Sequence, residues 1–189
     1  MGYDFKQIAK GARAFLDAGN TLKSNLNNGY PGTELIPAYV NTAIACELYM
    51  KAMLVYKEPN TTEQKLKSLS HNLSRLFKEI PSEIHDRIKT KIPDNEVINR
   101  EESAYNSLNE LLKSSNISTE VRNIANNQIS NKATSFDQIL ENHSRIFVDW
   151  RYHFVATDLK PIYCNEWFLY TFCIELHNEM VAIMNHAYS

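Results

Sequence analysis

Glycine and proline are scarce in this sequence, and their positions constrain the fold more than any other feature. The 189 residues contain five glycines and six prolines, about half the number that average usage would give. Folds made of many short strands need many tight turns, so sandwiches, barrels and propellers are disfavoured. Most of these residues stand between segments with helical apolar spacing, namely Gly29, Pro31, Gly32, Pro37, Pro59, Pro81, Pro93 and Pro161. The sequence therefore predicts an all-α fold.

Four long amphipathic segments repeat apolar residues every three or four positions. They cover about residues 4–26, 37–57, 135–156 and 166–187. Shorter helices are expected between the second and third segments, where the polar stretch 81–133 forms an accessory helical insertion. We expect one domain over the whole chain, built as an antiparallel up-and-down helical bundle of the four long helices.

Three polar residues are predicted to cap helices at their N-termini. Asp4 precedes the first long segment, Ser70 precedes a short helix that buries Leu73 and Phe77, and Ser135 precedes the third long segment. A capping side chain accepts a hydrogen bond from an amide that the helix itself leaves without a partner. These residues therefore predict where the helices begin.

Charge and cysteine content restrict the classes of partner and compartment. The formal net charge is −2, with 43% hydrophobic and 22% charged residues, which is typical of a globular chain and leaves room only for a local basic site. Cys46, Cys164 and Cys173 lack zinc spacing, and the N-terminus lacks a secretory leader, so reduced thiols in the cytoplasm are expected. Charged residues interrupt the apolar stretch 167–187, so no membrane span is expected.

Several motifs that bind cofactors or metals are missing from the sequence. It contains neither G-x-x-x-x-G-K-[ST] nor G-x-G-x-x-G, the loops that cradle phosphates, and it lacks H-E-x-x-H. It also lacks the Glu-x-x-His pairs of di-iron helical bundles. We therefore expect no cofactor and no bound metal.

A charged pair lies on the second long segment. Glu47 and Lys51 are four residues apart, in the order that favours an ion pair on a helix. They are expected either to form a surface pair or to place Glu47 against a cation from a facing helix. Arg151 is the best candidate for that cation, because it lies between Trp150 and Tyr152 and is expected to be partly buried.

The third long segment carries a charged ladder, in which Glu141, Arg145, Asp149 and His153 follow one another every four residues. Such a ladder is either a solvated helix face or a polar groove. In a groove, His153 oriented by Asp149 would act as an acid or base near neutral pH. The opposite stripe of this segment is mainly apolar and consists of His143, Phe147, Trp150, Arg151 and Phe154.

Three passages in order resemble the HEPN superfamily, an all-α domain found in prokaryotic toxins, phage-defence proteins and nucleotidyltransferase partners. Residues 45–54 (ACELYMKAML) are similar to its second-helix pattern, and residues 70–76 (SHNLSRL) are similar to the His-(Asp/Asn)-Leu start of its following helix. Residues 147–152 (FVDWRY) are similar to a Phe-x-x-Trp-Arg-Tyr passage of one branch. The resemblance covers about residues 4–80 and 135–187.

This resemblance implies a bundle that often dimerises, so a homodimer is expected. In many members it also implies a metal-independent endoribonuclease, in which Arg stabilises phosphorane charge and His transfers a proton in an Arg-x(4–6)-His motif. The present sequence departs from that motif, because His153 lies eight residues beyond Arg145 and no histidine follows Arg151 at the motif spacing.

Three functions remain open. The first is a HEPN-like domain without catalysis, of a defence or toxin–antitoxin type, that binds RNA, a nucleotide or a protein partner through Arg151, Tyr152, Glu47, Lys51 and His71. The second is a metal-independent endoribonuclease that uses His153, Arg145 and Asp149. The third is a purely structural, antitoxin-like interaction protein. The position of His71 at the start of its helix is also compatible with simple packing or capping.

Overall fold

Helices account for all the regular secondary structure in the described part of the chain. The computed structural model describes residues 3–27, 35–69, 71–113, 132–144 and 165–187. The helices there are α1 (Phe5–Asn27), α2 (Leu35–Lys57), α3 (Glu63–Ser68), α4 (Leu73–Glu79), α5 (Ser82–Lys91), α6 (Asp94–Lys113), α8 (Phe136–Asn142) and α10 (Glu166–His186). The all-α prediction is confirmed.

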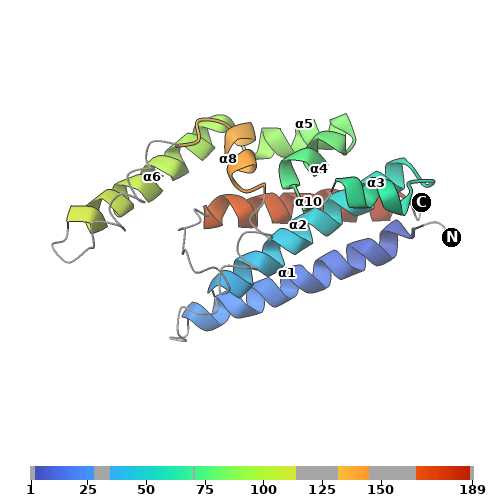
Figure 1. The fold of residues 1–189 in the computed structure, drawn as a ribbon, viewed down its shortest axis with the longest axis horizontal. Helices are drawn as coiled ribbons and strands as arrows, with labels where there is room; N and C mark the ends of the chain where they lie inside the picture. The colour runs from blue at the N-terminus through green and yellow to red at the C-terminus, as the bar shows by residue number, and fades with distance from the viewer. Residues whose placement is uncertain (1–2, 28–34, 70, 114–131, 145–164, 188–189) are drawn as a thin grey trace.

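Helix α2 lies at the centre of the arrangement and packs against α1, α10 and α4. Figure 1 shows α1 running antiparallel to α2, whereas α10 runs in the same direction as α2. Helices α4, α5 and α8 lie on the opposite side from α1, where α5 contacts α10 and α4 contacts α8. Helix α6 contacts α8 and extends away from the other helices.

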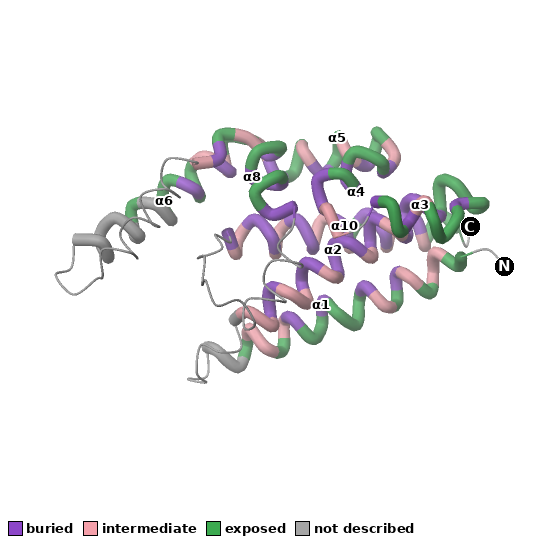
Figure 2. Tube along the Cα trace, in the orientation of Figure 1, coloured by how far each residue is buried: buried purple, intermediate pink, exposed green. Residues whose placement is uncertain are grey.

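The central position of α2 follows from its composition. Every residue from 36 to 55 is buried or half-buried, because apolar side chains occupy most of the helix circumference. Figure 2 shows buried positions along α2 and α10 and more exposed positions on α1. Met50 and Met53 of α2 are fully buried. A helix with apolar residues on all sides must be covered by neighbours on all sides, and α1, α4 and α10 provide that cover.

An aromatic cluster joins α10 to the short helices. Phe168 and Phe172 of α10 stack with ring centroids 5.7 Å apart. Phe77 of α4 and Phe136 of α8 both meet Phe172 edge-on, at 5.4 and 5.8 Å. Edge-to-face and offset arrangements are the favourable ones for aromatic rings, so this cluster fixes α4 and α8 against α10.

Polar caps set the starts of the short helices. Thr62, Ser135 and Asn165 accept hydrogen bonds from amides in the first turns of α3, α8 and α10, so the cap predicted at Ser135 is confirmed. The cap predicted at Ser70 is wrong, because Asn72 accepts from the Arg75 amide and α4 begins at Leu73. His71 therefore precedes the helix rather than opening it, and its position is fixed by the turn before the cap.

The predicted length of the third long helix, over residues 135–156, is wrong. Helix α8 ends at Asn142, and His143 and Ser144 form a turn. The apolar spacing continues beyond this point, but tertiary contacts stop the helix. The His143 ring accepts from the Asn165 amide, and the Ser144 carbonyl accepts from the Leu73 amide. The ladder that starts at Glu141 therefore does not lie on one continuous helix.

Candidate functional site

Three of the predicted ligand-binding residues meet at one buried carboxylate. Glu47 of α2 is 6% exposed. Its Oε1 accepts a hydrogen bond from Lys51 Nζ at 2.6 Å, and its Oε2 accepts from His71 Nδ1 at 2.8 Å. Glu47 and Lys51 therefore do not form a simple surface pair. The side chain of His71 reaches the same carboxylate from another segment of the chain.

The turn before α4 brings His71 to Glu47. Asn72 caps α4, and Leu73 is buried in the core. These two residues hold His71, which precedes them, beside α2. The side chain of His71 is 43% exposed, whereas that of Glu47 is 8% exposed. A buried carboxylate thus holds one edge of an imidazole whose other parts reach the surface. This arrangement restrains the ring in the way that catalytic and ligand-binding imidazoles are restrained.

The same turn is tied to the start of the segment that carries the other predicted site residues. The Leu73 amide donates to the Ser144 carbonyl at 3.0 Å. Arg145 follows Ser144 directly in the chain. Ser144, the last described residue before Arg145, therefore lies against the first residue of α4, although about 70 residues separate the two in sequence.

Five predicted residues lie outside the described part of the chain, namely Arg145, Asp149, Arg151, Tyr152 and His153. The contact predicted between Glu47 and Arg151, and the catalytic set Arg145, Asp149 and His153, therefore stay predictions. Glu47 itself has both oxygens hydrogen-bonded to described residues.

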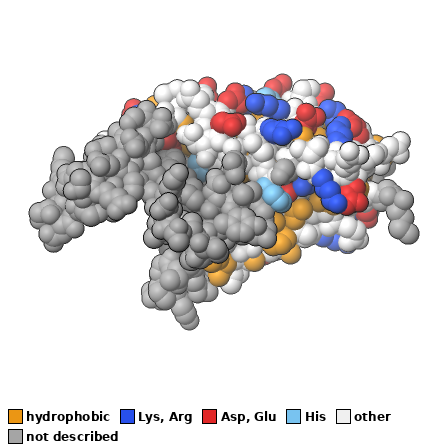
Figure 3. Space-filling view, in the orientation of Figure 1, with side chains coloured by type: hydrophobic (Ala, Val, Ile, Leu, Met, Phe, Trp, Pro, Cys, Tyr) orange, Lys and Arg blue, Asp and Glu red, His pale blue; other side chains and the backbone are white. Residues whose placement is uncertain are grey.

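The Glu47–Lys51–His71 cluster brings one ammonium and one imidazole to a single carboxylate. Removing the carboxylate would leave Lys51, whose side chain is 16% exposed, without its hydrogen-bond partner in the cluster. On the face in Figure 3, described cationic and anionic side chains are interspersed. A local cluster of this kind is the form of basic site that a net charge of −2 allows.

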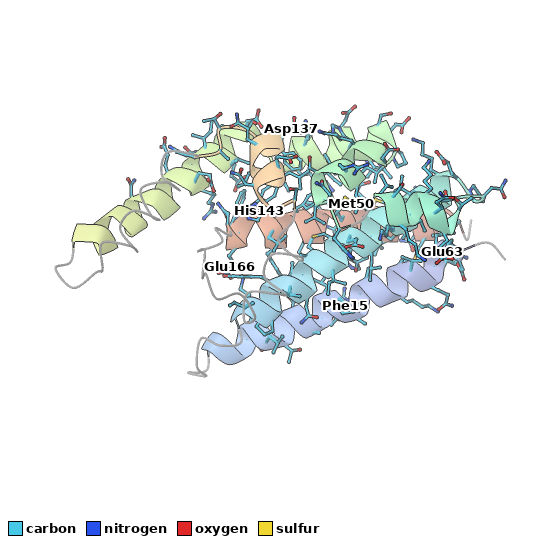
Figure 4. All side chains as sticks on the ribbon, in the orientation of Figure 1. Phe15, Met50, Glu63, Asp137, His143 and Glu166 are labelled. Atoms are coloured by element: carbon cyan, nitrogen blue, oxygen red, sulfur yellow. The ribbon has the colours of Figure 1, made fainter. Side chains whose placement is uncertain are left out.

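A second, fully buried polar group anchors both ends of the segment between α8 and α10. The His143 Nδ1–H donates to the Ile139 carbonyl at 2.7 Å, and Nε2 accepts from the Asn165 amide at 2.8 Å. The Asn165 side chain donates to Glu101 of α6 at 2.5 Å. Figure 4 labels His143 close to α10. Burial lowers the pKa of His143 below its usual 6.5, against smaller raising effects of the Ile139 carbonyl and Glu101, so this histidine is neutral and structural.

A third polar network was missed by the sequence analysis. Arg13 of α1 donates from Nη1 to His177 Nε2 at 2.9 Å, and His177 Nδ1 lies 2.9 Å from the Tyr49 hydroxyl. Asp17 pairs with the Arg13 Nε at 2.9 Å. These residues come from α1, α2 and α10, and only Arg13 and Asp17 have a recognisable spacing. The network adds a polar link to the contacts between α1 and α10.

Comparisons with protein-family models, with curated proteins and with solved structures give no match. In the described ranges, no helix combines the length and the apolar character needed to cross a membrane. Among the same residues, no group of three or more His, Cys, Asp or Glu side chains is placed to hold a metal ion. The chemistry available at the described part of the site is therefore that of the Glu47, Lys51 and His71 side chains.

Proposed function

We propose that this chain is a HEPN-like helical domain that binds RNA through its phosphates, without a metal. The observation that carries the proposal is the convergence of His71 and Lys51 on the buried Glu47. Two residues after His71, the Leu73 amide donates to the Ser144 carbonyl. Arg151 and Tyr152, in the segment that follows Ser144, complete the proposed site. The antiparallel up-and-down bundle expected from the four long segments and the homodimer implied by the resemblance belong to the same proposal.

The chemistry of the cluster supports a phosphate ligand. The half-exposed imidazole of His71 is oriented by a carboxylate on Nδ1, and the Lys51 ammonium lies at the same carboxylate. An imidazolium and an ammonium form charge-assisted hydrogen bonds with phosphate oxygens. Arg151 would add a bidentate contact to phosphate, and Tyr152 would add an aromatic face on which an unpaired base stacks.

Replacing His71 or Arg151 by alanine is expected to weaken RNA binding about tenfold each, because one charge-assisted contact is worth about 1.5 kcal/mol or more. The measurement is fluorescence anisotropy of a labelled single-stranded RNA at several KCl concentrations. Affinity should fall as KCl rises, with a shallow slope, because a few phosphate contacts release few counterions. The matched control is Lys67→Ala, which removes an exposed lysine paired with Glu63 on α3 and should leave affinity unchanged.

Three other outcomes would overturn the proposal. Equal loss in Lys67→Ala and His71→Ala would mean that binding is diffuse rather than localised at the cluster. Cleavage of RNA in EDTA that disappears in His153→Ala would establish the endoribonuclease alternative in place of simple binding. Undetectable or salt-independent binding would leave the protein-interaction alternatives.

A further inference from the structure

The hydrogen bonds of His177 determine its protonation state. A guanidinium has donors only, so His177 Nε2, which lies 2.9 Å from Arg13 Nη1, must accept and carries no proton. The single ring proton of a neutral histidine then lies on Nδ1 and is donated to the Tyr49 hydroxyl oxygen at 2.9 Å. Tyr49 is 1% exposed, so the inner end of this chain of hydrogen bonds is fixed in the core.

We propose that protonation of His177 releases Arg13, and with it one of the links between α1 and α10. A proton on Nε2 would place an N–H donor and a positive charge against the Nη1 donor and the positive charge of Arg13. The hydrogen bond would be replaced by repulsion. Arg13 keeps its pairing with Asp17, four residues along α1, and its side chain is 52% exposed, so it can turn to solvent without a further loss.

Ionisable groups of α1 and α2 face His177. Arg13 and Asp17 act on it from α1, and the Tyr49 hydroxyl of α2 hydrogen-bonds to its ring. Tyr49 in turn interacts with Cys46 and Cys173, and Arg13 interacts with Tyr170. Burial lowers the pKa of His177, Arg13 lowers it further, and Asp17 raises it in part. Tyr49 is held neutral because burial raises the pKa of its hydroxyl.

The pH range in which Arg13 is released follows from the direction of the shift in the His177 pKa. We call the arrangement with the Arg13–His177 hydrogen bond closed and the arrangement without it open. His177 binds a proton less readily in the closed arrangement than in the open one, in which it has its usual pKa of 6.5. The closed arrangement is therefore fully favoured above that value and loses stability as the pH falls through it toward the lowered pKa. Full protonation of His177 raises the equilibrium constant for opening tenfold for each unit by which its pKa in the open arrangement exceeds that in the closed arrangement.

The change is confined to the α1–α10 contact. Helix α1 also packs along α2, and Lys23 of α1 pairs with Glu166 of α10 at 2.7 Å. Acidification should therefore loosen the middle of α1 against α10 while the rest of the fold persists. The proposal is independent of the RNA site, whose described residues are Glu47, Lys51 and His71.

The test is an NMR titration of the histidine Cε1–H signals of the full chain, combined with hydrogen exchange of the amides in α1. We expect His177 to titrate below 6.5 with Nε2 unprotonated at neutral pH, and to titrate at higher pH in Arg13→Gln. After correction for intrinsic rates, α1 should exchange faster at pH 5.5 than at pH 7.5 in the wild type. This difference should be lost in His177→Gln and kept in His186→Gln, which changes an exposed histidine of the same helix.

Two results would overturn the proposal. The first is a wild-type His177 pKa at or above 6.5, a measurement that does not depend on any variant folding. The second is an acid-induced rise in α1 exchange that is the same in wild type and His177→Gln, because the rise would then come from another group.

Discussion

Replacing Phe172 by alanine is expected to destabilise the folded chain by about 3–5 kcal/mol, the usual cost of removing a buried phenylalanine ring. Phe172 is fully buried and contacts the rings of Phe77, Phe136 and Phe168 from α4, α8 and α10. For a chain of this size the loss corresponds to a fall in Tm of roughly 10 °C. The measurement is thermal and urea unfolding followed by circular dichroism.

The control for this prediction is Phe15→Ala, which removes the same ring from a position on α1 that is 37% exposed. It should change stability by less than about 1 kcal/mol. Phe172→Leu should recover most of the loss, because it restores most of the buried apolar volume. Equal effects of Phe172→Ala and Phe15→Ala would contradict the placement of α4 and α8 against α10.

Replacing His143 by alanine is expected to cost about 2–4 kcal/mol of stability, because it leaves the buried Asn165 amide without its acceptor and creates a cavity. His143 is fully buried and is the link between the end of α8 and the cap of α10. The free energy of unfolding from urea titration at pH 7.5 measures the effect. His186→Ala, which removes an exposed histidine from the last turn of α10, should change stability by less than about 1 kcal/mol.

The His143 variant should also have a changed pH dependence. In the wild type, burial lowers the pKa of His143 below the unfolded value near 6.5. The unfolded state then binds more protons, so stability is retained above that value and lost as pH falls through it. His143→Ala removes this contribution, and its deficit relative to wild type should therefore shrink at pH 5. A deficit that stays constant with pH would mean that His143 is not a neutral buried group.

The sequence predicted the elements whose local pattern agrees with their packing. The apolar repeats of α2 and α10 are long, and both helices pack in the core, so their extents were nearly correct. The helix from Ser135 was predicted too long, because its periodicity persists beyond Asn142. The contacts that end it reach the chain from Leu73 and Asn165, and no local pattern reports them.

The candidate site was predicted in part for the same reason. Glu47 and Lys51 are neighbours on one helix, and their pairing follows from spacing alone. The approach of His71 depends on how α4 packs on α2, and the sequence did not predict it, because Arg151 was the expected partner of Glu47. The Arg13–His177–Tyr49 network gave no signal, because its members are 36 or more residues apart and no motif joins them.

The central claim is that RNA contacts His71 and Lys51 at the Glu47 carboxylate. The six histidines of the chain are natural probes of this claim, because each gives its own Cε1–H signal. Titration of the wild-type protein with an unlabelled single-stranded RNA should move the His71 signal in a saturable manner, together with that of His153, and should leave His85, His177 and His186 in place. A saturable shift of His177 or His186 with an unmoved His71 would contradict the account.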